Sequence, residues 1–129
     1  MSARAAVVSS PFRVAAVSES VGLPLVFVAV GIVFAALGVP LARGRVRPNF
    51  WYGCRTHKTL SDEKIWYAVN RVTGRDLIAG GACISAAALA LLAAGRGMNP
   101  TARAIVLLSV TSLSVVAMAV DSRRVSRRM

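Results

Sequence analysis

The sequence predicts an all-α integral membrane protein with three transmembrane helices and a short amphipathic interfacial helix in the loop between the first two. The composition is one reason: 56% of the 129 residues are hydrophobic and the mean hydropathy is +0.62, above what a soluble domain shows. A second reason is that the apolar residues form three blocks without a charge, at 21–42, 77–95 and 104–120. At about 1.5 Å per residue these blocks reach roughly 33, 28 and 26 Å, and a bilayer core is about 30 Å thick.

The first apolar block is predicted to be a membrane anchor that follows an extracytoplasmic segment, residues 1–20. Two arginines precede the block, as in a signal peptide, but the block is longer than the ~7–15 residues of a signal h-region. Arg43, Arg45 and Arg47 follow it directly. We therefore expect residues 21–42 to remain in the mature protein as the first transmembrane helix.

The loop over residues 43–76 contains both tryptophans, both tyrosines and the only histidine of the chain. Residues 49–53 have the character of a turn, with aromatic side chains suited to the membrane–water boundary. Thr59 and Asp62 fit a capping box that would begin a helix. Ser61, followed by two acidic residues, is an equally good start.

The helix that begins there is expected to be amphipathic. It would place Ile65, Trp66 and Val69 on one side and charged residues mainly on the others. This pattern is typical of a short helix that lies in the membrane interface, and Gly74 is its expected end.

The second transmembrane helix is predicted over residues 77–95. Its alanines recur at four-residue spacing, at Ala82, Ala86, Ala90 and Ala94. Small residues spaced in this way let helix backbones approach closely in lipid. We therefore expect this alanine column to face another helix.

The third transmembrane helix is predicted over residues 104–120, after an extracytoplasmic loop at 96–103. Asn99 and Pro100 are a good helix start, with Asn as the cap and Pro in the first turn. None of the three apolar blocks contains an acidic, basic or histidine side chain, which a proton or ion route would normally show.

The basic residues predict the orientation. The 43–76 loop and the 121–129 tail carry twelve lysines and arginines, whereas the N-terminal segment and the 96–103 loop carry four. Basic residues concentrate on the cytoplasmic side. The sequence thus predicts a multi-pass membrane protein, with the N-terminus outside and the C-terminus in the cytoplasm.

Several function classes have little support in the sequence. The net charge of +11 is explained by arginines that flank apolar spans, so we expect no direct contact with nucleic acid. Cys54 lies in the loop and Cys83 in the second span, so a disulfide is not expected. With one histidine and no CxxC motif, we expect no metal and no other cofactor. No acid–base pair or nucleophile triad appears, and the sequence is not that of an enzyme.

The loop residues resemble the signature of the SdpI family, which runs as an Asn, Gly-x-Arg-Thr, Thr-Leu, a Trp, a His or Asn, and a Gly before the next span. The residues that carry the resemblance are Asn49, Gly53, Arg55, Thr56, Thr59, Leu60, Asp62, Trp66, Asn70, Gly74, Gly80 and Gly81. The resemblance implies an immunity protein of the bacterial inner membrane that protects its producer from a secreted peptide toxin and sequesters a transcriptional repressor at the membrane. With three spans, this chain is shorter than the bacterial member after which the family is named.

Seven loop residues are candidates for binding a ligand or partner: Asn49, Gly53, Arg55, Thr56, Thr59, Trp66 and Asn70. The guanidinium of Arg55 and the hydroxyls of Thr56 and Thr59 could clamp a carboxylate, a lipid phosphate or backbone carbonyls. Alternatively, Arg55 could pair with Asp62 or Glu63 and have a structural role. For Trp66, anchoring in the interface is favoured over stacking on a ligand.

Two functions follow as hypotheses. The first is an immunity or signalling protein that binds a peptide toxin, a lipid or a cytoplasmic regulator without catalysis. The second is a small transporter or transporter accessory. The arginine-rich tail could bind anionic lipids, but a role as a topology signal is favoured. Self-association is left open.

Overall fold

The computed structural model describes residues 11–129, with side chains described from residue 21 onward. Of the extracytoplasmic segment predicted at 1–20, residues 1–10 lie outside the described residues, whereas residues 11–20 are helical and continuous with the first apolar block. Three long helices dominate this part of the chain: α1 (Pro11–Ala42), α3 (Glu63–Ala94) and α4 (Pro100–Arg128). A short helix, α2 (His57–Ser61), lies in the loop, and a 3₁₀ turn, η1 (Gly95–Gly97), follows α3. The predicted all-α fold is confirmed, and all three long helices are long and apolar enough to cross a membrane.

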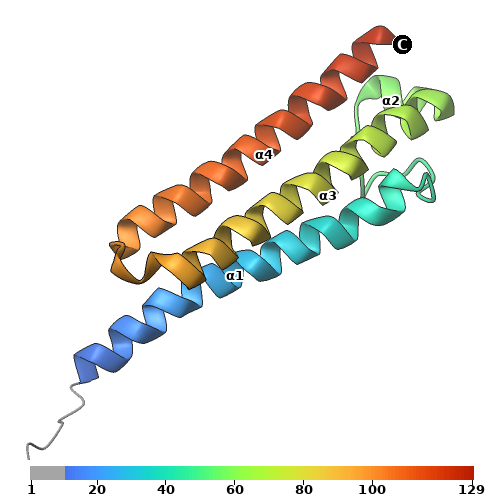
Figure 1. Cartoon of the computed structure of the whole chain (residues 1–129). Coiled ribbons are helices and arrows are strands. Elements are labelled where there is room, and N and C mark those ends of the chain that lie inside the picture. Colours follow the sequence, from blue (N-terminus) through green and yellow to red (C-terminus); the bar gives the residue numbers. More distant parts are fainter. Residues whose placement is uncertain (1–10) are drawn as a thin grey trace, which may run out of the picture.

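The three long helices lie side by side with α3 in the middle (Figure 1). Both α1 and α4 pack against α3 and make few contacts with each other. The α1–α2 loop and the C-terminal part of α4 lie at the same end of the bundle (Figure 1), which we call the loop end.

Glycines allow α1 and α3 to approach closely. A Cβ at Gly81 would overlap the Gly31 carbonyl oxygen, and a Cβ at Gly74 would lie 2.6 Å from the Gly38 carbonyl oxygen. Further from the loop end than both contacts, the Ser85 hydroxyl donates a hydrogen bond of 3.2 Å to the Val28 carbonyl. Close backbone packing of this kind holds helices together where the surroundings are as apolar as the side chains.

The expected packing of the alanine column is wrong. The four alanines at 82, 86, 90 and 94 are exposed, whereas Gly81, Ile84 and Ala88 are buried. Because successive residues are rotated by about 100° around a helix, the face that carries the glycines turns the alanine column outward. The column therefore faces away from both α1 and α4.

The helix predicted to end at Gly74 is the first part of α3, which continues without a break into the second apolar block. Gly74 lies inside the helix and does not end it. Because it has no side chain, it allows the backbone of α1 to approach α3 closely. The caps also differ from the expected ones. Thr56 caps α2 with Thr59 as its partner, and Asp62 caps α3 by accepting from Lys64 N and Ile65 N. The extended backbone of Asp62 separates the two helices.

Helix α4 begins as predicted, with the Asn99 side chain accepting from Thr101 N at 2.9 Å and Pro100 in the first turn. It continues through the predicted tail to Arg128. Only 6% of its most apolar stretch is buried. At the loop end it is held to α3 by a hydrogen bond of 2.8 Å between the hydroxyls of Thr73 and Ser122, both of which are 5% exposed.

Candidate ligand site at the loop end

Asn49 shapes the turn after α1. Its Oδ1 accepts from Trp51 N at 2.9 Å and Tyr52 N at 2.7 Å, and its Nδ2 donates to the Arg47 carbonyl at 2.8 Å. The Tyr52 hydroxyl donates to the Leu37 carbonyl, which ties the turn back to α1. The polar groups of Asn49 are therefore occupied by the loop itself.

Gly53 and Asn70 form a clamp between the loop and α3. Gly53 has φ +106°, and a Cβ there would overlap Oδ1 of Asn70. That oxygen accepts from Cys54 N at 2.6 Å, while Nδ2 donates to the Trp66 carbonyl at 3.0 Å. Only glycine adopts this backbone region without strain. The side chain of Asn70 is 2% exposed, so it fixes the loop and is not open to a ligand.

Trp66 holds the start of the loop. Its ring is fully buried, and its Nε1 donates to the Val46 carbonyl at 2.8 Å. The structure thus places Trp66 in the core. It neither anchors the chain in the membrane interface, as the sequence favoured, nor presents its ring to a ligand. The exposed aromatic side chains of the loop are Phe50 and Trp51, at 74% and 90% exposed.

Thr56 and Thr59 bind each other at the start of α2. Thr56 N donates to Thr59 Oγ1 at 2.8 Å, and Thr59 N donates to Thr56 Oγ1 at 3.1 Å. Thr59 is fully buried, and its hydroxyl also donates to the Cys54 carbonyl at 3.1 Å. Arg55 is exposed and donates to the Phe50 carbonyl; in the described chain neither Asp62 nor Glu63 forms a salt bridge with it.

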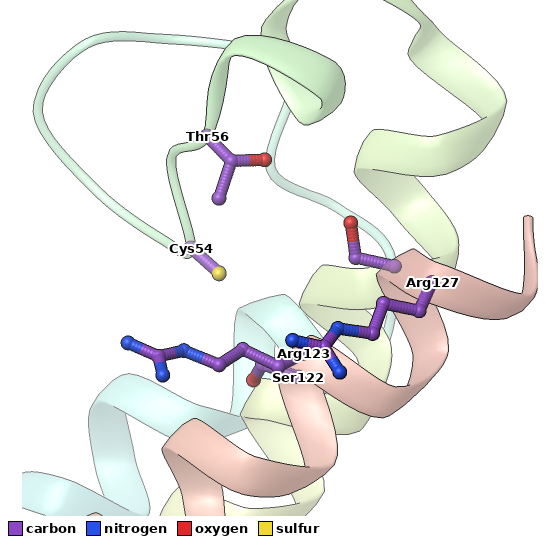
Figure 2. A pocket seen from close by; sticks show the side chains of 6 residues that line it. Cys54, Thr56, Ser122, Arg123 and Arg127 are labelled. Atoms are coloured by element: carbon purple, nitrogen blue, oxygen red, sulfur yellow. The ribbon is translucent and has the colours of Figure 1, made fainter.

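A polar cavity of about 300 Å³ lies between the loop and α4. Figure 2 shows Cys54 and Thr56 above it, with the side chains of Arg123 and Arg127 extending from α4 beneath them. Its lining residues are Cys54, Thr56, Ser122, Arg123, Ser126 and Arg127. Of the seven candidates from the sequence, only Thr56 lines this cavity.

The four α4 residues of the polar cavity were not predicted as site residues. The signal that could have found them is their spacing, since Ser122 and Ser126, and Arg123 and Arg127, are each four residues apart. Residues four apart share a face of a helix, and no proline or glycine interrupts the chain between Val120 and Arg128.

An apolar cavity of about 380 Å³ adjoins the polar one. Its lining runs from Leu41 at the end of α1, over Thr73 and Leu77 of α3, to Met118 and Ala119 of α4. The two cavities share Cys54, Thr56, Ser122 and Arg123. They therefore form one site with an apolar part between α1 and α4 and a cationic part beneath the loop.

The charge of the site comes from its arginines. Burial raises the pKa of the Cys54 thiol, and a hydrogen bond with Ser122 partly offsets this, so the thiol stays neutral and weakly nucleophilic near pH 7. Burial likewise raises the pKa of Tyr52.

Lys58 donates to the Ser126 carbonyl at 2.8 Å, which joins α2 to α4. Within the part of the chain that the structure describes, no cluster of His, Cys, Asp or Glu could hold a metal ion.

A family model, described as the SdpI/YfhL protein family, matches residues 45–120. The match covers more than half of the chain and includes the loop, α2, α3 and most of α4. No curated protein and no solved structure matches the chain. Its three apolar helices and this match identify the chain as a multi-pass membrane protein that belongs to the SdpI/YfhL protein family.

Proposed function

We propose that this chain is an immunity protein of the bacterial inner membrane that acts by binding, without catalysis, and has its loop end in the cytoplasm. The observation that carries the proposal is the site of two joined cavities between the family's motif loop and the basic end of α4. Cavities of about 300–1,000 Å³ with a few polar groups are typical of ligand sites. The loop end could also bind and sequester a cytoplasmic regulator, which is a second role for the same site.

The side chains of the polar cavity favour binding over chemistry. They offer guanidinium groups, hydroxyls and a thiol whose pKa is raised. A general base or an activated nucleophile would call for a carboxylate or imidazole near the thiol or a hydroxyl. The lining of the polar cavity includes neither, and we propose that this end of the molecule recognises a ligand.

The test of immunity is a susceptibility assay in the bacterium that encodes the chain. Deletion should lower the minimal inhibitory concentration of at least one secreted membrane-active peptide in a panel, and the wild-type chain should restore it. Asn70→Ala, which releases the loop from α3, should restore less protection at matched abundance. The exposed Ala90→Ser substitution should restore protection fully. Unchanged susceptibility of the deletion strain across the panel would contradict immunity.

Transport is the second candidate function, and Asp76 is the observation that favours it. The sequence places this residue in the loop, whereas the structure places it within α3. Its Oδ2 is buried and has no hydrogen-bond partner among the described residues, and it lines a narrow space with Gly80 and Ser114. Carboxylates in such positions often mark ion routes. Proton flux into liposomes that contain the wild-type chain, lost in Asp76→Asn, would support transport.

A further inference from the structure

We propose that the site at the loop end binds an anionic glycerophospholipid, with its phosphate between Arg123 and Arg127 and its acyl chain in the apolar cavity between α1 and α4. The inference names a ligand for the site described above. It rests on the proposal that this site binds a ligand, but not on immunity.

The two arginines are arranged to hold a phosphate. They are four residues apart on α4, both line the polar cavity, and their side chains run in the same direction beneath Cys54 and Thr56 (Figure 2). In the described chain neither guanidinium forms a salt bridge with a carboxylate. Guanidinium groups bind phosphate oxygens through paired hydrogen bonds, and both groups are open to do so.

The apolar cavity distinguishes a lipid from a free phosphate. It adjoins the cationic part at Arg123 and continues over Leu77, Met118 and Ala119. A dissolved phosphate would leave such an apolar surface uncovered, whereas the acyl chain of a lipid can cover it. The combination of one charged end and one apolar end selects an amphiphile.

The position of the site along α4 points to the headgroup region. The apolar block of this helix ends at Val120, and the basic residues begin at Arg123. Leu77 and Met118 lie within apolar blocks, so the apolar cavity is at the height of the hydrocarbon and the polar cavity beyond it. A phospholipid of the surrounding leaflet has its phosphate at the same boundary. It could enter from the side, between α1 and α4, which make few contacts with each other.

The neighbouring arginines of the same tail provide a matched control. Arg124 forms a salt bridge of 3.8 Å with Asp121, and Arg124 and Arg128 line a different face together with Val72. Each pair of arginines carries the same charge. A general attraction between the basic tail and an anionic membrane therefore depends equally on both pairs, whereas a defined site depends on only one.

The test uses the full chain in mild detergent with phosphatidylglycerol or phosphatidylcholine added, and native mass spectrometry counts the lipids retained. The wild-type chain should retain phosphatidylglycerol in preference to phosphatidylcholine. The R123Q/R127Q variant should lose this retention, and R124Q/R128Q should keep it. Circular dichroism checks that both variants have the helix content of the wild type.

A second pair of variants tests the acyl chain. Ala119→Trp should fill the apolar cavity and reduce the retention of phosphatidylglycerol, whereas Val116→Trp, at an exposed position outside the lining of the cavities, should not. Equal losses in the two arginine variants would overturn the proposal in favour of general charge attraction. Absence of a preference for phosphatidylglycerol would also overturn it. So would retention of a co-purifying peptide instead of lipid, if R123Q/R127Q loses it, because the cavity would then hold a peptide carboxylate.

Discussion

Single residues of the loop act mainly by shaping its backbone. Asn49, Thr59, Trp66 and Asn70 each direct their polar groups to backbone atoms nearby. A buried polar group that loses such a partner costs about 1–3 kcal/mol. The presence of these motif residues is therefore explained largely by the hydrogen bonds that fold the loop. The folded loop in turn forms one wall of the polar cavity.

Gly53 tests this explanation. Gly53→Ala combines a strained backbone at φ +106° with overlap of the new Cβ and Asn70 Oδ1, and should destabilise the chain by about 1–3 kcal/mol. Thermal unfolding in detergent, followed by circular dichroism, measures the effect. Gly97→Ala is the control, since a Cβ there meets nothing within 4 Å. Equal melting temperatures for the two variants would mean that the clamp contributes little.

Cys54 reports the environment of the site through its titration. Because burial raises the pKa of its thiol, less thiolate is present at a given pH, and the rate of alkylation should reach its midpoint above the pH seen for an ordinary thiol. Ser122→Ala removes the hydrogen bond that lowers the pKa and should move this midpoint further upward. The measurement uses a chain with Cys83→Ser and a small alkylating reagent.

Thr73→Val is the control for that shift, because it breaks the Thr73–Ser122 hydrogen bond while leaving the Ser122 hydroxyl for Cys54. Its midpoint should match that of the Cys83→Ser chain. A midpoint at or below that of free cysteine in the same detergent would contradict burial of the thiol at this position.

At the scale of elements, the α1–α3 pair is held by glycine contacts and not by the alanine column. Gly81→Ala would force a Cβ against the Gly31 carbonyl and to 2.8 Å from Ala35 N. Overpacking of this kind typically costs about 1–3 kcal/mol. Unfolding by increasing fractions of sodium dodecyl sulfate should therefore occur at a lower fraction for this variant.

Ala86→Leu is the matched substitution on the exposed face of the same helix. It should leave the unfolding midpoint near that of the wild type, because the larger side chain points away from α1 and α4. A larger loss of stability for Ala86→Leu than for Gly81→Ala would instead place the helix interface on the alanine column.

At the scale of the whole molecule, the distribution of charge predicts which side of the membrane each end occupies. The chain with Cys54→Ser, Cys83→Ser and Ser61→Cys presents one exposed thiol at the loop end. An impermeant maleimide should label it only after the inner membrane is opened, because basic residues concentrate at this end. Gly97→Cys in the same background lies at the opposite end and should be labelled in intact cells. The reverse pattern would contradict the predicted orientation.

Much of the architecture could be predicted from local properties of the sequence. The three apolar blocks and the Asn99–Pro100 helix start depend on the composition and caps of short segments. In lipid, a long apolar segment must satisfy its backbone hydrogen bonds as a helix. The same segments do not reveal which face of a helix meets its neighbour, since small residues occur on several faces of α3.

The sequence by itself determined that the chain has three segments able to cross a membrane, because length and hydropathy alone decide whether a segment can cross the hydrocarbon. Its motif residues also indicated the family. Only the tertiary structure decided that α1 and α3 meet through glycines and that Thr56 faces Arg123 and Arg127 across a cavity. Those contacts join residues far apart in the chain, and they depend on the rotation of each helix about its axis. That rotation is set by where two backbones approach most closely, and because small residues occur on several faces of α3, their spacing alone did not identify the face that meets α1.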